Sequence, residues 1–239
     1  MSLLLLYLLY KFEKMDYQLS FKVNNHIFLR DPESSELGKQ IVKNAIDLIY
    51  ELGIEHFTFK KLALKMSTTE ASIYRYFENK HRLLLYILNW YWSYMEFLVD
   101  FTLQNIQNPE EKLTKVIELF TQSLTESGCN LDYNKSYLNQ IVLSESSKVY
   151  LVKEVQEINK YQVFKPYKDL CNTVSKVILS YNPTYAYAKS LSSTLIETAH
   201  SQQYFSKNLP RLTDINDQKD ESFVLKFLNQ LIFAALKKA

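Results

Sequence analysis

Apolar residues recur at helical spacing along most of this chain. A first helix is predicted from about residue 34 to Leu52, with Gly53 ending it, because Leu37, Ile41, Ala45, Leu48 and Ile49 share one face. Asn79 can cap a long aromatic-rich helix with the sequence LLLYILNWYWSYMEFLVDF. Further helices are predicted from Asn108-Pro109 to about residue 127, over 133–146, over 148–180 with a break at Pro166, over 182–206 and over 217–237. The pattern predicts an all-α protein.

Residues 1–33 are expected to form an N-terminal extension. Leu19–Val23 and Ile27–Leu29 flank Asn24-Asn25, which predicts either a small β-hairpin or an extended arm. The apolar run Leu3–Tyr10 is too short to span a bilayer, which takes about 20 such residues, so no stable membrane insertion is expected. It is interpreted as an extra packing helix or as sequence upstream of a true start at Met15, with contact at a membrane surface as the alternative.

Composition agrees with a helical, ordered protein. The 239 residues include three Gly and five Pro, too few for the many turns of a sheet-rich fold. Aromatic residues make up 14%, which excludes a disordered chain. Cys129 and Cys171 lack the spacing of a metal site or redox motif, so we expect free thiols in a cytoplasmic protein.

The segment Phe57–Leu83 predicts two short helices joined by a tight turn. Ser67 and Thr68 make the turn, and Thr69 can cap a second helix with Ile73 and Phe77 on its inner face. A short exposed helix behind a sharp turn is the helix-turn-helix arrangement, whose second helix enters the DNA major groove. Between His56 and Arg82, six cations outnumber two anions, a local net charge of +4 that suits phosphate contact.

Each outward position has an expected task on DNA. Thr58 and Thr69 can present a hydroxyl and backbone amides to phosphates at helix starts. Glu70 and Ala71 lie where side chains reach base edges, a cytosine amino group or a thymine methyl. Tyr76 is expected to pack between helices. The candidate DNA-binding residues are Thr58, Lys60, Thr69, Glu70, Ala71, Ser72, Tyr74, Arg75 and Lys80.

The residue order of this segment resembles the TetR/AcrR family of transcriptional repressors. Phe57-Thr58-Phe59, Leu62-Ala63, the stretch SIYRYFENK and Leu83 carry the resemblance, with Ala45 and Gly53 upstream. It covers about residues 36–90. One departure is Ser67, where the family usually has Gly; Ser is strained there if the turn requires a positive φ.

The resemblance implies three parts: the extension 1–33, a three-helix DNA-binding domain 34–84, and a helical ligand-binding and dimerisation domain 85–239. It implies phosphate contacts by Tyr74 and Lys80, and a four-helix dimer interface from the helices at about 183–206 and 217–237. Phe223, Phe227 and Leu231 form the candidate dimer stripe. The implied function is a homodimeric repressor that binds double-stranded DNA at a palindromic operator and releases it on binding an apolar small molecule.

The sequence leaves one other function open. A helical ligand-binding or interaction protein without DNA binding is the chief alternative, favoured by Ser67 and by the near-neutral total charge of +2. An enzyme is not expected, because the four histidines lack partners at ligand spacing and the chain has no glycine-rich phosphate loop or nucleophile elbow. No catalytic residue, metal site or cofactor is predicted. The aromatic C-terminal half can enclose a cavity, but its pattern assigns no pocket residue.

Overall fold

The computed structural model describes residues 20–121, 133–151, 153, 155–215 and 222–237. Every regular element among them is a helix, which confirms the all-α prediction. The elements are η1 (Pro32–Ser34), α2 (Glu36–His56), α3 (Phe59–Lys65), α4 (Glu70–Tyr74), α5 (Lys80–Leu103), α6 (Pro109–Thr121), α7 (Lys135–Glu145), α8 (Ser147–Tyr150), α9 (Val155–Asn159), α10 (Lys165–Tyr181), α11 (Ala188–Asn208), η3 (Pro210–Leu212) and α12 (Phe223–Ala235).

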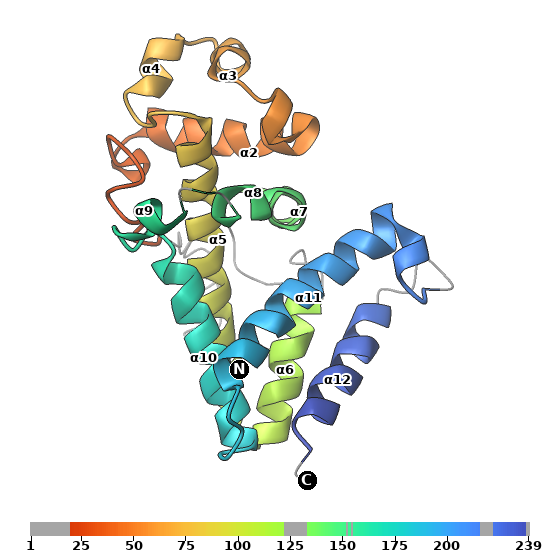
Figure 1. Ribbon diagram of the computed structural model, residues 1–239. Coiled ribbons are helices and arrows are strands. Elements are labelled where there is room, and N and C mark those ends of the chain that lie inside the picture. The colour runs from red at the N-terminus through yellow and green to blue at the C-terminus, as the bar shows by residue number, and fades with distance from the viewer. Residues whose placement is uncertain (1–19, 122–132, 152, 154, 216–221, 238–239) are drawn as a thin grey trace, which may run out of the picture.

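The helices form two groups joined by α5 (Figure 1). The first group, here called the head, consists of α2, α3 and α4. The second, here called the body, consists of α6, α10, α11 and α12, while α7, α8 and α9 lie below the head alongside α5. Helix α5 packs on α2 in the head and on α6 and α10 in the body, and its buried residues belong to one hydrophobic core that extends through both groups.

Helix α5 is apolar around most of its circumference because other elements cover it on several sides. Trp90, Tyr91, Trp92 and Tyr94 are all buried. A helix buried all round needs no polar face. No described helix combines the length and the apolar character needed to cross a membrane.

The described part of the N-terminal segment forms an arm and no hairpin. Its described part, residues 20–31, contains no strand. Asn24 and Asn25 lie at a turn, and Val23 and Ile27 beside it are buried rather than paired across a ladder. Phe21 packs edge-on against Trp90, with ring centroids 5.3 Å apart. The run Leu3–Tyr10 and Met15 lie outside the described residues.

Several predicted boundaries shift where side chains compete with the helix. The stretch 148–180 is divided into α8, α9 and α10, and Pro166 lies in the first turn of α10. Helix α11 begins at Ala188 and not at Asn182-Pro183. The Asn182 side chain accepts hydrogen bonds from the Thr184 N–H and hydroxyl and donates to the Leu236 carbonyl, which holds a turn before the helix.

Two residues of the head have a positive φ. Gly53 (φ 72°, ψ 159°) breaks α2 where the sequence predicted, in a region of backbone space open almost only to glycine. Ser67 has φ 52°. The N–H groups of Ser67 and Thr68 donate to the carbonyls of Leu64 and Ala63, which is a Schellman motif with serine at the position glycine usually takes.

Exchanging side chains at these two positions is expected to change stability in opposite directions. Ser67→Gly should raise the free energy of unfolding by about 0.5–1 kcal/mol, because glycine adopts a positive φ without a Cβ clash. Gly53→Ala should lower it by about 1–3 kcal/mol. Urea unfolding followed by circular dichroism measures both, with Ser67→Ala as the control that retains a Cβ. If Ser67→Gly and Ser67→Ala have the same stability, the serine is not strained.

Candidate nucleic-acid interface

The predicted caps of the helix-turn-helix are formed. The Thr58 hydroxyl oxygen accepts from the Lys61 N–H at 3.2 Å and starts α3. The Thr69 hydroxyl oxygen accepts from the Ser72 N–H at 3.3 Å and starts α4. Asn79 caps α5 through the Arg82 N–H. Threonine and asparagine side chains satisfy amides that the helix cannot pair, which is why these helices begin at those residues.

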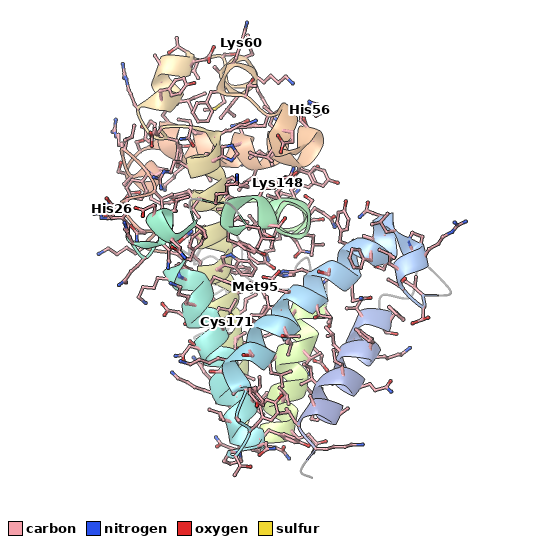
Figure 2. The ribbon with its side chains drawn as sticks, viewed as in Figure 1. His26, His56, Lys60, Met95, Lys148 and Cys171 are labelled. Atoms are coloured by element: carbon pink, nitrogen blue, oxygen red, sulfur yellow. The ribbon has the colours of Figure 1, made fainter. Side chains whose placement is uncertain are left out.

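Helix α4 presents one face to the core and one to solvent. Ile73 and Phe77 are fully buried, as predicted from their spacing. The candidate residues Thr69, Glu70, Ala71, Tyr74 and Arg75 are exposed, Ser72 is half-buried, and Thr58 and Lys60 are exposed at the start of α3. The structure therefore brings these eight candidates onto the surface of α3 and α4, and Figure 2 shows Lys60 at the tip of the head farthest from the body.

The two tyrosines of SIYRYF have different surroundings. Tyr74 is 48% exposed and rests the edge of its ring against Phe59, with centroids 4.9 Å apart. Tyr76 is buried, its hydroxyl is 2.7 Å from the Ser35 hydroxyl, and the Arg30 guanidinium lies over its ring. The expectation that Tyr76 packs between helices is confirmed, and the Tyr74 hydroxyl remains accessible to a phosphate.

The cations of the head divide into those already paired and those that are free. The Lys61 ammonium donates to the His56 carbonyl, and Lys65 and Arg82 approach Glu51 and Glu78 at 3.6 and 3.8 Å. Among the described residues, Lys60 and Arg75 have no hydrogen-bonded or ionic partner. On α3 and α4, these two side chains are therefore available for an external anion.

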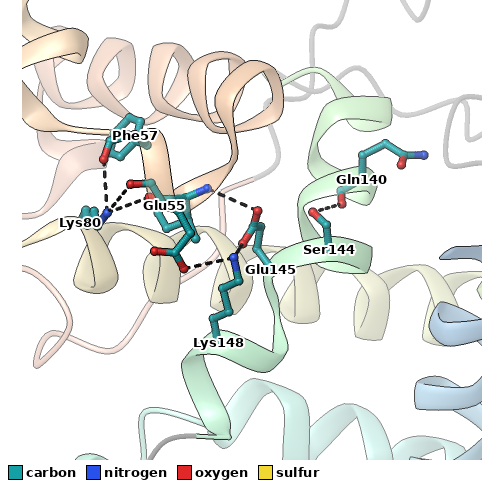
Figure 3. Close-up of polar contacts among 8 residues, drawn as sticks. Glu55, Phe57, Lys80, Gln140, Ser144, Glu145 and Lys148 are labelled. Atoms are coloured by element: carbon teal, nitrogen blue, oxygen red, sulfur yellow. Dashed lines mark hydrogen bonds and ion pairs between the residues drawn. The ribbon is translucent and has the colours of Figure 1, made fainter. Parts of the chain in front are cut away.

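Lys80 has a structural role that the sequence did not reveal. Its ammonium donates to the carbonyls of Ile54 at 2.9 Å, Glu55 at 3.1 Å and Phe57 at 3.5 Å (Figure 3). The break at Gly53 ends the regular hydrogen bonding of α2, so carbonyls of its last turn need other donors. Lys80 supplies them from the first residue of α5, and a phosphate contact by Lys80 stays a prediction.

A second contact holds the same turn from the other side (Figure 3). Glu145, at the end of α7, is buried and accepts from the Ile54 N–H at 3.3 Å. The Lys148 ammonium lies 2.9 Å from the Glu145 carboxylate and 3.2 Å from that of Glu55. We call Glu55, Glu145 and Lys148 the latch, because they join the last turn of α2 to α7 and α8.

The electrostatics of the latch favour its charged form. The hydrogen bond and charge of Lys148 lower the pKa of Glu55, and the hydrogen bond from Lys148 to Glu145 raises the pKa of the lysine.

An aromatic contact joins the same two helices, because Tyr50 of α2 stacks on Tyr137 of α7, with ring centroids 3.9 Å apart. Sequence reasoning missed Glu145 and Lys148, for which the only signal was an acid and a base three residues apart.

The candidate dimer residues lie on an outer face of α12. Val224, Leu228 and Ile232 are buried against the body, whereas Phe227 and Leu231 are 37% and 39% exposed. Phe223 is half-buried and stacks parallel to Phe227. Helix α12 therefore has two apolar faces, and its own chain covers one of them.

A comparison with known families addresses the head. Residues 41–87 match the sequence model described as bacterial regulatory proteins, tetR family. This segment is a tetR-family domain. The match runs from the middle of α2 into α5, so it includes Gly53, the caps, the Schellman turn and Lys80. No curated protein matched the chain.

Solved structures share the TetR fold over most of the chain. AibR in complex with isovaleryl coenzyme A and operator DNA has a TM-score of 0.53 and 16% identity, covering 83% of this chain and 97% of that chain. The fatty acid degradation regulator FadR from Bacillus halodurans has a TM-score of 0.56 and 18% identity, covering 81% and 92%. Superantigen PfiT has a TM-score of 0.57 and 16% identity, covering 88% and 100%. At these identities the likeness is one of fold.

Replacing Lys80 tests its role in the TetR head. Lys80→Met should lower the free energy of unfolding by about 1–2 kcal/mol, because carbonyls of the α2 end lose their donor. Lys60→Met, at an exposed lysine of α3, should change it by less than about 0.5 kcal/mol. Chemical denaturation of both variants gives the comparison, and equal stabilities would show that the Lys80 contacts contribute nothing measurable.

Proposed function

We propose that this protein is a transcriptional regulator that binds a palindromic operator as a homodimer and releases it when a small molecule binds. The observation that carries the proposal is the tetR-family helix-turn-helix with α4 exposed along its outer face. In such motifs the second helix enters the major groove. We assign residues 34–84 to DNA binding, 85–239 to ligand binding and dimerisation, and 1–33 to an N-terminal arm.

The assigned DNA contacts fall into two chemical classes. Lys60 and Arg75, with Thr58, Thr69, Ser72 and Tyr74, lie where they can meet phosphates, which give affinity and register. Glu70 and Ala71, in the first turn of α4, can reach base edges, which give sequence choice. Lys80 adds a phosphate contact only if its ammonium leaves the carbonyls of the α2 end.

The two classes should respond differently to substitution. Arg75→Ala should weaken binding to all DNA sequences alike and reduce the slope of log affinity against log salt by about 1, because one phosphate contact is lost. Glu70→Gln should leave that slope unchanged and alter the preferred sequence. Selection of DNA fragments by the purified protein, followed by binding assays at several salt concentrations, tests both.

Lys39→Ala on α2 is the control for charge outside the assigned interface. An unchanged salt slope in Arg75→Ala would remove Arg75 from the interface. Identical selected sites for wild type and Glu70→Gln would remove Glu70 from base recognition. Failure of the wild-type protein to select any sequence would contradict the proposed function itself.

The proposed dimer uses the uncovered apolar face of α12 together with α11. Phe227 and Leu231 of α12 are both partly exposed, and together they form an apolar surface that a second copy can bury. A two-fold axis through this surface makes the interface self-complementary. It would set two copies of α4 one DNA turn apart, about 34–36 Å, or a multiple of that distance.

Phe227→Asp is expected to give monomers or insoluble chain and to abolish specific operator binding, because a carboxylate would be buried at the interface. Leu179→Asp on α10 is a matched control, since Leu179 is 38% exposed and Phe227 37%. Analytical ultracentrifugation at micromolar concentration measures the state of each. A wild-type protein that sediments as a monomer would remove the dimer and the palindrome.

Ligand release requires that the ligand prefer the conformation that has left the operator. The proposed path is α5, whose buried aromatic side chains pack in the body and whose first residue, Lys80, holds the end of α2. AibR was solved with both isovaleryl coenzyme A and operator DNA, which supports the coexistence of both sites on this fold. A coupling free energy of about 1–3 kcal/mol would be typical.

A helical ligand-binding protein without DNA binding is the second candidate. One observation favours it: superantigen PfiT, whose name does not describe a regulator, shares the fold over its whole length. The DNA selection experiment separates the two functions.

A further inference from the structure

A carboxylate lies among aromatic rings where the body meets α8. Glu197 of α11 accepts hydrogen bonds from the Tyr150 hydroxyl at 3.0–3.1 Å and from the Tyr167 hydroxyl at 2.6 Å. The two tyrosine rings are nearly parallel, with centroids 6.2 Å apart. Trp92 of α5 completes the cluster, its ring centroid 4.7 Å from that of Tyr167.

No cation neutralises this carboxylate within the described part of the chain. No lysine or arginine there forms an ion pair with Glu197. His200 lies one turn further along α11 and next to Trp92, but burial lowers the pKa of His200 to about 4, so it is neutral near neutral pH. Burial raises the pKa of Tyr150 to about 12 and that of Tyr167 further, so both phenols stay protonated. The cluster therefore contains a carboxyl group and no charged basic side chain.

A small enclosed cavity adjoins these rings. Its walls include Asn89, Trp92, Tyr150, Phe164 and Tyr167, and its free volume is about 10 Å³. The Asn89 side chain is 2% exposed and donates to the Leu85 carbonyl, but its Oδ1 has no hydrogen-bond partner. A buried acceptor without a donor is unfavourable, so an N–H or O–H group bound in the cavity could donate to this oxygen and remove that cost.

We propose that this cavity is the effector site and that its ligand is a protonated organic amine with an apolar remainder. The ammonium group would lie against the faces of Trp92 and Tyr167, within the field of Glu197, and donate to Asn89 Oδ1. Aromatic faces attract cations, and a carboxylate with only hydroxyl donors has spare acceptor capacity. The apolar remainder would pack on Phe164, Leu88 and Val149. This inference deepens the ligand-release part of the proposed function and rests on it for its regulatory meaning.

The cavity in its present state holds about one water molecule, so a ligand must separate α5 from α8 and α10. A larger open cleft of about 390 Å³ lies on the surface beside it, lined by residues that include His81, Arg82, Lys148 and Ile158. Leu85 and Val149 line both the cleft and the cavity, so these two side chains lie between them.

Opening that wall would act on the latch. Val149 and Tyr150 directly follow Lys148, which pairs with Glu55 of the head and with Glu145. A ligand that displaces α8 from α5 therefore strains the contacts that hold the end of α2. Binding in the cavity would thus affect the position of the head through Lys148, Glu145 and Glu55.

Three small molecules of matched shape test the ligand class. Phenylpropylamine is a cation near neutral pH, phenylpropanol is neutral and phenylpropanoate is an anion. Calorimetry on the full chain, with Trp fluorescence as a second readout because Trp92 is one of two tryptophans, should show the amine binding at least about tenfold more tightly than the alcohol. The anion should bind more weakly than either.

Variants separate the site from a general apolar effect. Glu197→Gln should reduce the affinity for the amine about tenfold and leave that for the alcohol unchanged, whereas Glu157→Gln on α9, an exposed glutamate paired with Lys160, should change neither. Asn89→Leu should also weaken the amine. Circular dichroism melting of each variant confirms that it is folded, and Tyr167→Phe, which keeps the ring, replaces Glu197→Gln if that variant unfolds.

Equal affinities for amine and alcohol would overturn the proposal. So would an amine affinity unaffected by Glu197→Gln, or by Tyr167→Phe where Glu197→Gln does not fold. No binding of the amine would show a cavity that holds water only. Gel shifts without any ligand test operator binding separately. If the protein binds amines but no DNA, the site stands and the regulatory function fails; if it binds DNA and no amine, the reverse holds.

Discussion

The break in α2 at Gly53 is the constraint on which the placement of the head depends. A helix that stops leaves backbone groups unpaired, and these must find partners elsewhere. Here the partners come from two other helices: Lys80 of α5 takes carbonyls on one side, and Glu145 of α7 takes the Ile54 N–H on the other. The freed backbone groups thus become the joint between the head and the rest of the molecule.

Helix α5 connects this joint to the body. Five of its aromatic residues, Tyr86, Trp90, Tyr91, Trp92 and Tyr94, are buried, so α5 cannot move without repacking its neighbours. The joint combines the polar contacts of Lys80 and the latch with the Tyr50–Tyr137 stack, while the contacts along α5 are mostly apolar. A small change of packing near Trp92 would therefore be felt at Lys80 and the latch, where alternative hydrogen bonds with water are available.

Some cations of the head contact groups of the protein itself and others face only solvent, a difference that the total charge of the chain does not show. Lys61, Lys65, Lys80 and Arg82 all contact groups of the protein itself, whereas Lys60 and Arg75 contact none among the described residues. Only two of the six cations between His56 and Arg82 are thus without a contact in the described part of the protein itself. The body contains the opposite kind of group: the Glu197 carboxyl accepts hydrogen bonds from tyrosine hydroxyls, lies among aromatic rings and has no described cation as a partner.

Local patterns in the sequence determined the helices, the caps at Thr58, Thr69 and Asn79, the break at Gly53 and the outward face of α4, because each depends on neighbours within a few residues. The sequence left a hairpin and an extended arm open at Asn24-Asn25, and the structure has the arm over its described residues, with Val23 and Ile27 buried. Tertiary structure alone decided that Lys80 caps α2, that Glu145 and Lys148 form the latch, and that Glu197 meets Tyr150 and Tyr167. The partners of the α2 end lie about 25 to 90 residues away from it in sequence. Tyr167 and Tyr150 lie 30 and 47 residues from Glu197. A pattern over a few residues cannot show which distant helices the fold brings together.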